Sequence, residues 1–313
     1  MAPVVSIIIV SYNTRDLTLE CLASIIKETK NYTYEIIVID NQSTDGSAKA
    51  IRDKFPQITL FEPEFNLGFS AGNNEAAKFA NGKYLLLLNP DTKILDAAID
   101  NLIAHAEQNP DSKIWGGKAV FPDGSVNATC WNDMTVWSTI CKAFGLTFLF
   151  PKSKLFNPET IHAWDQLNEV RQVDIVVGCF LLIELSFWNL IGGFNPTFFM
   201  YGDEVDLSIR ARKRGASPTI TPTAKIIHYG GRSEPSSEEK LIKLLKGKIS
   251  IMKVHWPSHT ALIGKYLILI AVFSRALANT ILRFPLSQNS RLNKNSTAWS
   301  RAFRRRKEWC SGW

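Results

Sequence analysis

The first half of the chain alternates between apolar runs and polar, helix-forming segments. Residues 4–10 and 34–40 are rich in β-branched side chains and predict buried strands, and residues 58–61 predict a third, shorter strand. Apolar side chains recur at helical spacing over residues 17–26, and residues 47–54 suit a short helix. Strands and helices that alternate at such short spacing predict a parallel sheet with right-handed crossovers.

The strongest apolar run, Tyr-Leu-Leu-Leu-Leu over residues 84–88, follows a helix expected over residues 68–80. It stops at Asn-Pro-Asp-Thr, positions 89–92, and predicts a strand that is buried on both faces. Ligands of an open parallel sheet bind just outside the carboxyl ends of its strands, so Asp91 is expected at the rim of the sheet. The alternative is an ordinary turn, because all four residue types favour turns.

The second half of the chain has a less regular pattern. We expect a helix over residues 96–108, a strand over 113–120, another strand over 173–183, and a short helix with a glycine stop over 187–194. Between them, residues 127–172 are irregular and rich in aromatic side chains. This stretch forms either one wall of a substrate groove or a packed excursion, and the sequence leaves both open.

Polar side chains follow three of the predicted strands. Tyr12 and Asn13 come after the first, Asp40 ends the second, and Asp91 follows the run at 84–88. Their convergence on one rim predicts a nucleotide site in which Asp40 accepts hydrogen bonds from a ribose or a base, or else Asp40 is only a turn carboxylate. No glycine-rich phosphate-binding motif occurs, so a divalent cation held by Asp91 is the candidate that meets the phosphate charge.

An acidic helix start follows an aromatic cluster at residues 198–201. Asp203, Glu204 and Asp206 lie in the first turn of a helix that ends with basic residues and Gly215. Charges so placed complement the helix dipole, which is the structural explanation. Carboxylates crowded under an apolar lid also have raised pKa values, which suits a general base.

A histidine follows two short β-like pieces at residues 219–221 and 225–227. A single histidine at a strand end is more often structural than a ligand. The two glycines and Arg232 that follow His228 make this one a candidate for the site.

Composition and charge fit a folded α/β protein of 313 residues with an appendage. Part of the net charge of +7 comes from a late basic cluster, Arg301, Arg304, Arg305, Arg306 and Lys307. The five cysteines are scattered, so we expect neither a disulfide framework nor a thiolate zinc site, but a reduced cytosolic compartment. The start of the chain shows no signal-peptide pattern.

The C-terminal part from residue 236 is expected to be helical, with its most apolar run at residues 261–275. Lys265 and Arg275 leave an apolar core shorter than the ~20 residues of a spanning helix. An interfacial helix with a basic tail on an anionic membrane surface is therefore expected. The alternative is a helix packed on the catalytic domain or in a dimer interface, so a homo-oligomer stays open.

Taken together, six stretches resemble the family 2 glycosyltransferases, the inverting enzymes with the GT-A fold, and within them the bacterial rhamnosyltransferase-like branch. The stretches are residues 5–13, 38–46, 66–74, 85–92, 198–212 and 228–233. The resemblance implies an α/β, GT-A type nucleotide-binding domain with a mostly parallel central sheet flanked by helices. This catalytic domain would span residues 1–233, with a nucleotide-sugar half to about residue 120 and an acceptor half from about 121. Residues 234–313 would form the membrane-associating helical appendage.

The resemblance also implies an activity. The chain would move a sugar, with rhamnose as the candidate, from a nucleotide diphosphate sugar to a hydroxyl of a glycan or of a polyprenyl-diphosphate-linked glycan. It would use Mg²⁺ or Mn²⁺, act in cell-surface polysaccharide synthesis, and lie in the cytoplasm on the inner face of the membrane, without binding nucleic acid. The alternatives are a nucleotidyltransferase acting on sugar phosphates and a non-catalytic nucleotide- or sugar-binding module.

The resemblance assigns roles to named residues. Glu204 would be the catalytic base, with Asp203 as its competitor because the family's Glu-Asp order is reversed here, and Asp206 would be a structural or acceptor-binding acid. Asp91 and His228 would hold the metal, although Asn89 replaces the first aspartate of the family's D-x-D motif. The residues implied in nucleotide-sugar binding are Ser11, Asn13, Asp40, Asn66, Asn89 and Arg232.

Overall fold

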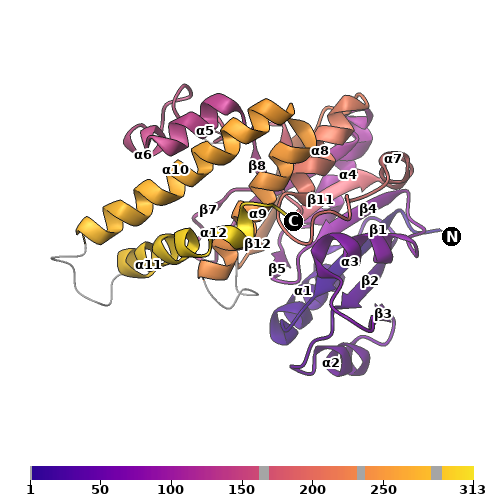
Figure 1. Ribbon diagram of the computed structural model, residues 1–313. Helices are drawn as coiled ribbons and strands as arrows, with labels where there is room; N and C mark the ends of the chain where they lie inside the picture. The colour runs from indigo at the N-terminus through magenta and orange to yellow at the C-terminus, as the bar shows by residue number, and fades with distance from the viewer. Residues whose placement is uncertain (1, 162–168, 231–236, 283–290) are drawn as a thin grey trace. The chain divides into compact units, whose positions relative to one another are not determined.

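The computed structural model describes residues 2–161, 169–230, 237–282 and 291–313 (Figure 1). Cα packing divides the chain into two units. The sheet unit comprises Met1–Trp131, Ala163–Phe199 and Asp203–Ser233; the helical unit comprises Asn132–His162, Met200–Gly202 and Glu234–Trp313. The division into a nucleotide-sugar half and an acceptor half stays a prediction.

The first four strands of the sheet unit form the predicted parallel sheet. They are β1 (Val5–Ser11), β2 (Tyr34–Asp40), β3 (Thr59–Phe61) and β4 (Tyr84–Leu88), in the spatial order β3-β2-β1-β4. Ser11 pairs with Asp40 at the carboxyl ends of β1 and β2. The predicted convergence of these strand ends on one rim is therefore confirmed.

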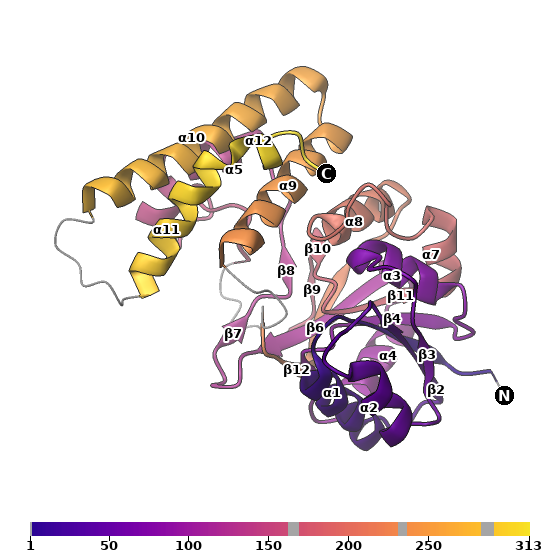
Figure 2. The same cartoon turned by 60° about the horizontal axis from the view of Figure 1, so that its bottom comes forward.

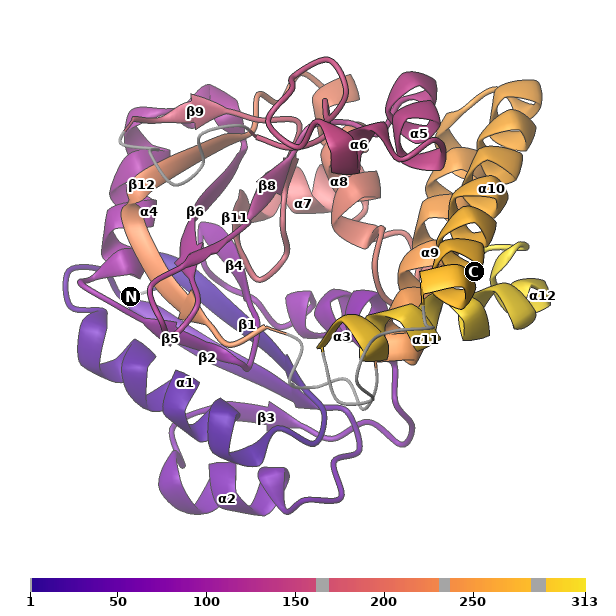
Figure 3. The ribbon, with the colours of Figure 1, turned by 90° about the vertical axis from the view of Figure 1, so that its left-hand side faces the viewer.

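The other half of the sheet is mixed rather than parallel (Figure 3). Strand β11 (Phe180–Glu184) runs antiparallel to both β4 and β6 (Ile114–Val120). Strand β12 (Thr219–His228) is parallel to β6 and antiparallel to the edge strand β5 (Thr92–Ile94). The minor strands are β7 (Val126–Asn127), β8 (Cys130–Trp131), β9 (Arg171–Gln172) and β10 (Ile175–Val176).

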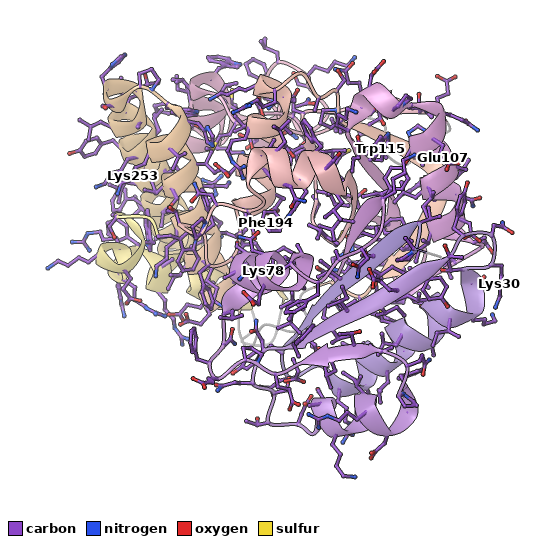
Figure 4. All side chains as sticks on the ribbon, turned by 90° about the vertical axis from the view of Figure 1, so that its right-hand side faces the viewer. Lys30, Lys78, Glu107, Trp115, Phe194 and Lys253 are labelled. Carbon is purple, nitrogen blue, oxygen red and sulfur yellow. The ribbon has the colours of Figure 1, made fainter. Side chains whose placement is uncertain are left out.

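The core of the sheet unit lies on both faces of this sheet. All five residues of β4 are buried, as predicted for a strand covered on both sides. Trp115 of β6 is also buried; its ring packs edge-on against Tyr84 and its Nε1 donates to the Asn109 carbonyl at 3.0 Å (Figure 4). The helices of this unit are α1 (Arg15–Glu28), α2 (Ser47–Lys54), α3 (Gly68–Ala77), α4 (Ala98–Gln108), the 3₁₀ turn Pro110–Ser112, α7 (Leu185–Ile191) and α8 (Asp203–Lys213).

Three local predictions differ from the structure. The strand expected over residues 173–183 is broken, because β10 pairs with β8 in a separate two-stranded sheet and only β11 joins the main sheet. The two short pieces expected around residues 219–227 are one strand, β12, with a register shift between Thr221 and Lys225. The stretch expected to be irregular contains the helices α5 (Val136–Ala143) and α6 (Leu146–Leu149).

The helical unit combines α5 and α6 with the late helices α9 (Ser237–His255), α10 (Ser258–Leu282), α11 (Arg291–Arg304) and α12 (Arg306–Trp309). Helix α10 is the longest, and α11, α5 and α9 pack against it (Figure 2). The core of the helical unit is built from apolar side chains of these helices, including Ile249, Met252, Val272 and Trp309. The predicted helical C-terminal part is confirmed.

Helix α10 is longer than the apolar run expected from the sequence. Its stretch Ser258–Ala278 is long and apolar enough to cross a membrane, by length and composition alone, and contains an 18-residue window with a mean hydropathy of 1.8. Only 28% of this window is buried within the protein. One helix of this kind does not by itself establish a membrane span.

Candidate active site

The turn after β4 holds Asp91 at the edge of the sheet. The Thr92 hydroxyl donates to the Asn89 carbonyl at 2.7 Å, and the Tyr229 amide donates to the Asp91 carbonyl at 2.9 Å. These two bonds fix the backbone on both sides of Asp91, whose side chain is buried. Asn-Pro-Asp-Thr is thus a turn, as its composition favours, and it also presents a carboxylate at the strand end.

His228, the last residue of β12, meets this turn. Its Nε2 lies 3.3 Å from Oδ1 of Asp91 and 3.4 Å from Nδ2 of Asn89. On the other side of the ring, Nδ2 of Asn127 lies 3.2 Å from Nδ1. The structure therefore brings His228 to Asn89 and Asp91, although His228 lies 139 positions after Asn89 in the sequence.

Cys179 is a site residue that the sequence did not reveal. It is buried just before β11, and its carbonyl accepts a hydrogen bond from the Asn89 amide at 3.1 Å. Its side chain lies close enough to His228 and to Glu204 to raise the pKa of both groups. Cys179 thus connects the Asp91–His228 pair to the acidic helix start.

The environment of His228 favours its charged form. Burial alone lowers the pKa of an imidazole, but the interactions with Cys179 and with the Asp91 carboxylate outweigh burial and raise the pKa of His228 to about 10. Asp91 and His228 are therefore a charge pair enclosed by protein. A cation bound by Asp91 would compete with the imidazolium for the same carboxylate.

Helix α8 begins with the acidic cluster. Asp203 is buried, and its Oδ2 accepts a hydrogen bond from the Ser70 hydroxyl at 2.9 Å. Burial, followed by the charge of the neighbouring Asp203, raises the pKa of Glu204 well above the usual carboxyl range. A carboxyl group with a raised pKa is suited to act as a general base.

Asp206 has a different set of contacts. It is fully buried, and its Oδ2 accepts from Nε of Arg210 at 2.7 Å. The other nitrogens of this guanidinium donate to the carbonyls of Ile191 and Gly193, each at 2.6 Å. Asp206 thus anchors an arginine that holds the end of α7 in place, and of the two roles expected for it these contacts fit the structural one.

Asp40 has one unsatisfied carboxylate oxygen. Its Oδ1 accepts from the Ser43 amide at 2.7 Å, whereas Oδ2 is buried and has no hydrogen-bond partner among the residues that the structure describes. Burial raises the pKa of Asp40. A buried polar atom without a partner costs free energy, so Oδ2 is an acceptor available to a ligand N–H or O–H group.

Ser11 and Asn13 lie beside Asp40 but use their side chains within the protein. The buried Ser11 hydroxyl contacts those of Thr14 and Thr18 at 3.1 and 3.0 Å. Oδ1 of Asn13 accepts from the Thr44 amide at 2.7 Å. Both residues therefore shape the rim, and their role in nucleotide-sugar binding stays a prediction.

The loop before α3 is fixed by two asparagines. Oδ1 of Asn66 accepts from the Gly68 amide at 2.8 Å, and Asn41 accepts from the Leu67 amide and donates to the Gly68 carbonyl at 3.0 and 2.9 Å. Gly68 has a φ of +75°, and a Cβ there would lie 2.7 Å from the Phe199 carbonyl oxygen, so only glycine fits. Asn41 was missed as a supporting residue, and Arg232 lies outside the described residues.

An asparagine within α3 holds the segment that leads to α8. Oδ1 of Asn74 accepts from the Phe194 amide at 2.9 Å, and Nδ2 of Asn74 donates to the Phe194 carbonyl at 2.8 Å. The ring of Phe194, labelled in Figure 4, packs between Phe69 and Trp188. These contacts fix the chain upstream of the acidic helix start.

The site offers two side chains to a divalent cation. Asp91 supplies a carboxylate oxygen, and His228 supplies an imidazole nitrogen once metal binding displaces the proton that its surroundings favour. This pair suits Mn²⁺, while Mg²⁺ prefers oxygen ligands. Among the described residues, no group of three His, Cys, Asp or Glu side chains is arranged to hold a metal. The donor set therefore fits a cation that takes its remaining ligands from phosphate oxygens and water.

The amino-acid sequence matches the profile of the family described as Glycosyl transferase family 2 over residues 6–161. The O-antigen biosynthesis protein RfbC of Myxococcus xanthus is 28% identical over 236 residues, 74% of this chain and 18% of RfbC. The N-acetylglucosaminyl-diphospho-decaprenol L-rhamnosyltransferase of Mycobacterium tuberculosis H37Rv is 27% identical over 246 residues, 74% of this chain and 78% of that protein. The match thus spans a small part of RfbC but most of the mycobacterial protein.

Solved structures share the fold. The mannosyltransferase PcManGT from Pyrobaculum calidifontis, in complex with GDP-Man and Mn²⁺, has a TM-score of 0.59 and 16% identity, covering 98% of this chain and 88% of that one. GalNAc-T7 with UDP, GalNAc and Mn²⁺ has a TM-score of 0.60 and 16% identity, covering 99% and 55%. At this identity the likeness concerns the fold alone, and that fold is the GT-A type. The profile and the curated relatives agree that this chain belongs to glycosyl transferase family 2.

Proposed function

We propose that this chain is an inverting glycosyltransferase that moves a sugar from a nucleotide diphosphate sugar to an acceptor hydroxyl. The observation that supports it most is the presence of two distinct groups, the Asp91–His228 pair and the Asp203–Glu204 pair, with Cys179 near both His228 and Glu204. The first group suits a metal-bound diphosphate, and the second suits proton transfer. A sugar-binding module would need neither.

The donor would bind along the carboxyl ends of β1, β2 and β4. Oδ2 of Asp40 supplies an acceptor for a base or ribose donor group, and Asn41 and Asn66 hold the adjacent loop. Asp91 and His228 would hold Mg²⁺ or Mn²⁺. When bound, the cation stabilises the charge of the departing nucleotide diphosphate as a Lewis acid.

Glu204 is the proposed base. It takes the proton of the acceptor hydroxyl while that oxygen bonds to the anomeric carbon, and the bond from this carbon to the diphosphate oxygen breaks on the opposite face, inverting the configuration. General-base help of this kind contributes typically ~10²–10⁴-fold to the rate. Asp203 is the weaker candidate because its Oδ2 is occupied by Ser70.

The acceptor is proposed from the relatives. The mycobacterial relative is named for N-acetylglucosaminyl-diphospho-decaprenol and for L-rhamnose. We infer a polyprenyl-diphosphate-linked glycan acceptor and rhamnose as the first sugar to test, in the synthesis of a cell-surface polysaccharide. Such an acceptor places the enzyme on the cytoplasmic face of the membrane, where α10 and the basic tail would contact anionic lipid.

The test is a donor screen. The purified chain is incubated with a panel of nucleotide diphosphate sugars and with Mg²⁺ or Mn²⁺, and the released nucleotide diphosphate is measured. Release from one donor, dependent on the cation, is the expected result. Incorporation of a nucleoside monophosphate into a sugar phosphate, with release of pyrophosphate, would identify a nucleotidyltransferase. Tight donor binding without turnover, with or without lipid-linked acceptor, would identify a binding module.

A further inference from the structure

Helix α10 carries a stripe of exposed apolar side chains. Its members are Leu262, Ile263, Tyr266, Ile270, Phe273 and Leu277, each between 44% and 58% exposed. Their spacing repeats with the helical period, so they lie along one face of the helix. The residues on the opposite face, among them Ile268 and Val272, are buried in the core of the helical unit. The stripe is therefore an apolar face that this unit leaves uncovered.

A second apolar patch lies on the connection from α5 through α6. Its members are Phe144, Phe148, Leu149 and Phe150, between 48% and 84% exposed. Both patches belong to the helical unit, and α5 packs directly against α10 (Figure 1). A hydrogen bond from Arg275 to the Lys142 carbonyl at 3.1 Å joins the two helices.

Exposure on this scale is unusual for a protein surface that meets only water. Single exposed apolar residues are common. Ten large apolar side chains exposed on one unit mark a surface that something else covers. Three phenylalanines and a leucine lie exposed on this connection of seven residues. The chemistry of the flanking residues indicates what covers them.

Basic side chains border both patches. Phe273 of the stripe packs against Phe303 with ring centres 5.2 Å apart, and the Arg306 guanidinium lies 5.1 Å from the centre of the Phe303 ring. Arg304 and Lys307 are exposed on the same segment, and Lys152 is exposed two residues after Phe150. Aromatic and aliphatic groups flanked by cations match an anionic lipid interface, whereas protein interfaces are depleted in lysine.

We propose that the α5–α6 connection is a second membrane-inserting element, which enters the headgroup region of an anionic bilayer together with the α10 stripe. Phe144, Phe148, Leu149 and Phe150 contact the upper part of the acyl chains, and the neighbouring basic side chains contact lipid phosphates. The proposal rests on the proposed function in taking the acceptor to be lipid-linked. It adds that membrane binding is not confined to the C-terminal helix and tail.

The experiment compares three variants of the full chain. F148D/L149D removes the apolar tip of the α5–α6 connection, and Y266D/I270D charges the α10 stripe. F65D is the matched control, because Phe65 is 64% exposed on the sheet unit and belongs to neither patch. Flotation is measured with vesicles of phosphatidylcholine alone and with phosphatidylglycerol added, and release of nucleotide diphosphate from the soluble donor is measured in parallel.

We expect F148D/L149D and Y266D/I270D each to partition at least about tenfold more weakly onto the anionic vesicles, since each variant replaces two apolar side chains that would leave water on binding by charged ones. F65D should partition like the unchanged protein, and turnover of the soluble donor should persist in all three. Normal partitioning of F148D/L149D beside weakened partitioning of Y266D/I270D would overturn the proposal and leave the proposed function intact. A change from dimer to monomer in F148D/L149D, with normal flotation, would show that a second copy covers the patch and would also overturn it.

A second experiment tests the proposal on protein that stays bound to the vesicles. F148C carries an environment-sensitive fluorophore, and four of the five native cysteines are buried. A blue shift of the label on anionic vesicles, and its quenching by lipids brominated near the headgroup, are expected. An unchanged spectrum on vesicles that bind the protein would place Phe148 outside the bilayer and overturn the proposal.

Discussion

Asp40 is the site residue whose hydrogen bonding is least complete within the described protein, since Oδ2 has no partner there. We expect D40N to weaken binding of the nucleotide diphosphate by about 10- to 100-fold, the usual effect of losing a hydrogen bond to a charged group. Isothermal titration with the nucleotide identified in the donor screen measures it. D123N, a change in an exposed turn carboxylate, is the control. Equal affinities of D40N and the unchanged protein would remove Asp40 from the binding site.

Glu204 is predicted to act in the chemical step alone. E204Q should lower turnover by roughly 10²–10⁴-fold while donor affinity stays unchanged. Because burial and Asp203 raise its pKa, the rate of the unchanged enzyme should fall as the pH drops through that raised pKa, above the usual carboxyl range. Steady-state kinetics across pH, beside donor titration, measure both effects. Full transfer activity in E204Q would move the base to Asp203.

Asp91 is predicted to act in metal-dependent binding. D91A removes the carboxylate that the turn after β4 presents, so donor binding should lose its dependence on Mg²⁺ or Mn²⁺ and weaken by roughly tenfold or more, since a bound cation and its charge-assisted contacts are lost. Donor titrations with and without the cation measure this. Metal-independent transfer at the normal rate in the unchanged enzyme would refute the role given to Asp91.

At the scale of elements, the pattern of apolar residues predicted those strands and helices that depend on local sequence. The parallel strands β1 to β4 were predicted because each is a continuous apolar run closed by polar residues, and Asp40 and Asp91 followed from those strand ends. Cys179 could not be predicted, since its place depends on β11 pairing antiparallel to β4 across a long stretch of chain. Helix α5 was missed because its capping box uses Thr135 and Ser138, without the glutamate or glutamine that usually marks this motif.

The anchor between α8 and α7 gives a prediction about stability. D206A leaves the Arg210 guanidinium, three-quarters buried, without its carboxylate, so the free energy of unfolding should fall by about 3 kcal/mol. Urea unfolding measures it. D53A is the control, because Asp53 pairs with Lys49 at the same helical spacing on an exposed surface, where such pairs contribute roughly 0.3–0.5 kcal/mol. Equal losses in the two variants would contradict the anchoring role.

At the scale of the whole molecule, the helical unit contains a cluster in which Lys142, Lys248 and Arg275 surround one carboxylate, Glu159. The charge of Lys142, and then burial, lower the pKa of Lys248 to about 8 from its usual 10.5. The unfolded chain therefore binds more protons than the folded one between these pH values, and the free energy of unfolding should rise with pH across this window.

K248M should remove this rise, which is at most roughly 3 kcal/mol because one pKa unit corresponds to about 1.4 kcal/mol. At pH 7 the variant should also be at least as stable as the unchanged protein, because the substitution removes one of three crowded positive charges. Urea unfolding of both proteins from pH 7 to 10.5 measures the difference. Parallel curves for the two proteins would show that Lys248 keeps its ordinary pKa.

The helical unit is assembled from residues 132–162, 200–202 and 234–313, and strands β11 and β12 of the mixed sheet lie between the first and the last of these segments in the sequence. During synthesis α5 leaves the ribosome well before α10 exists to pack against it. A nascent chain that has completed its sheet unit therefore still displays uncovered apolar helix faces, the condition under which chains aggregate or bind chaperones. Shortening the chain from its C-terminal side would make that transient state permanent, so such truncations are expected to cost solubility before they reveal anything about membranes.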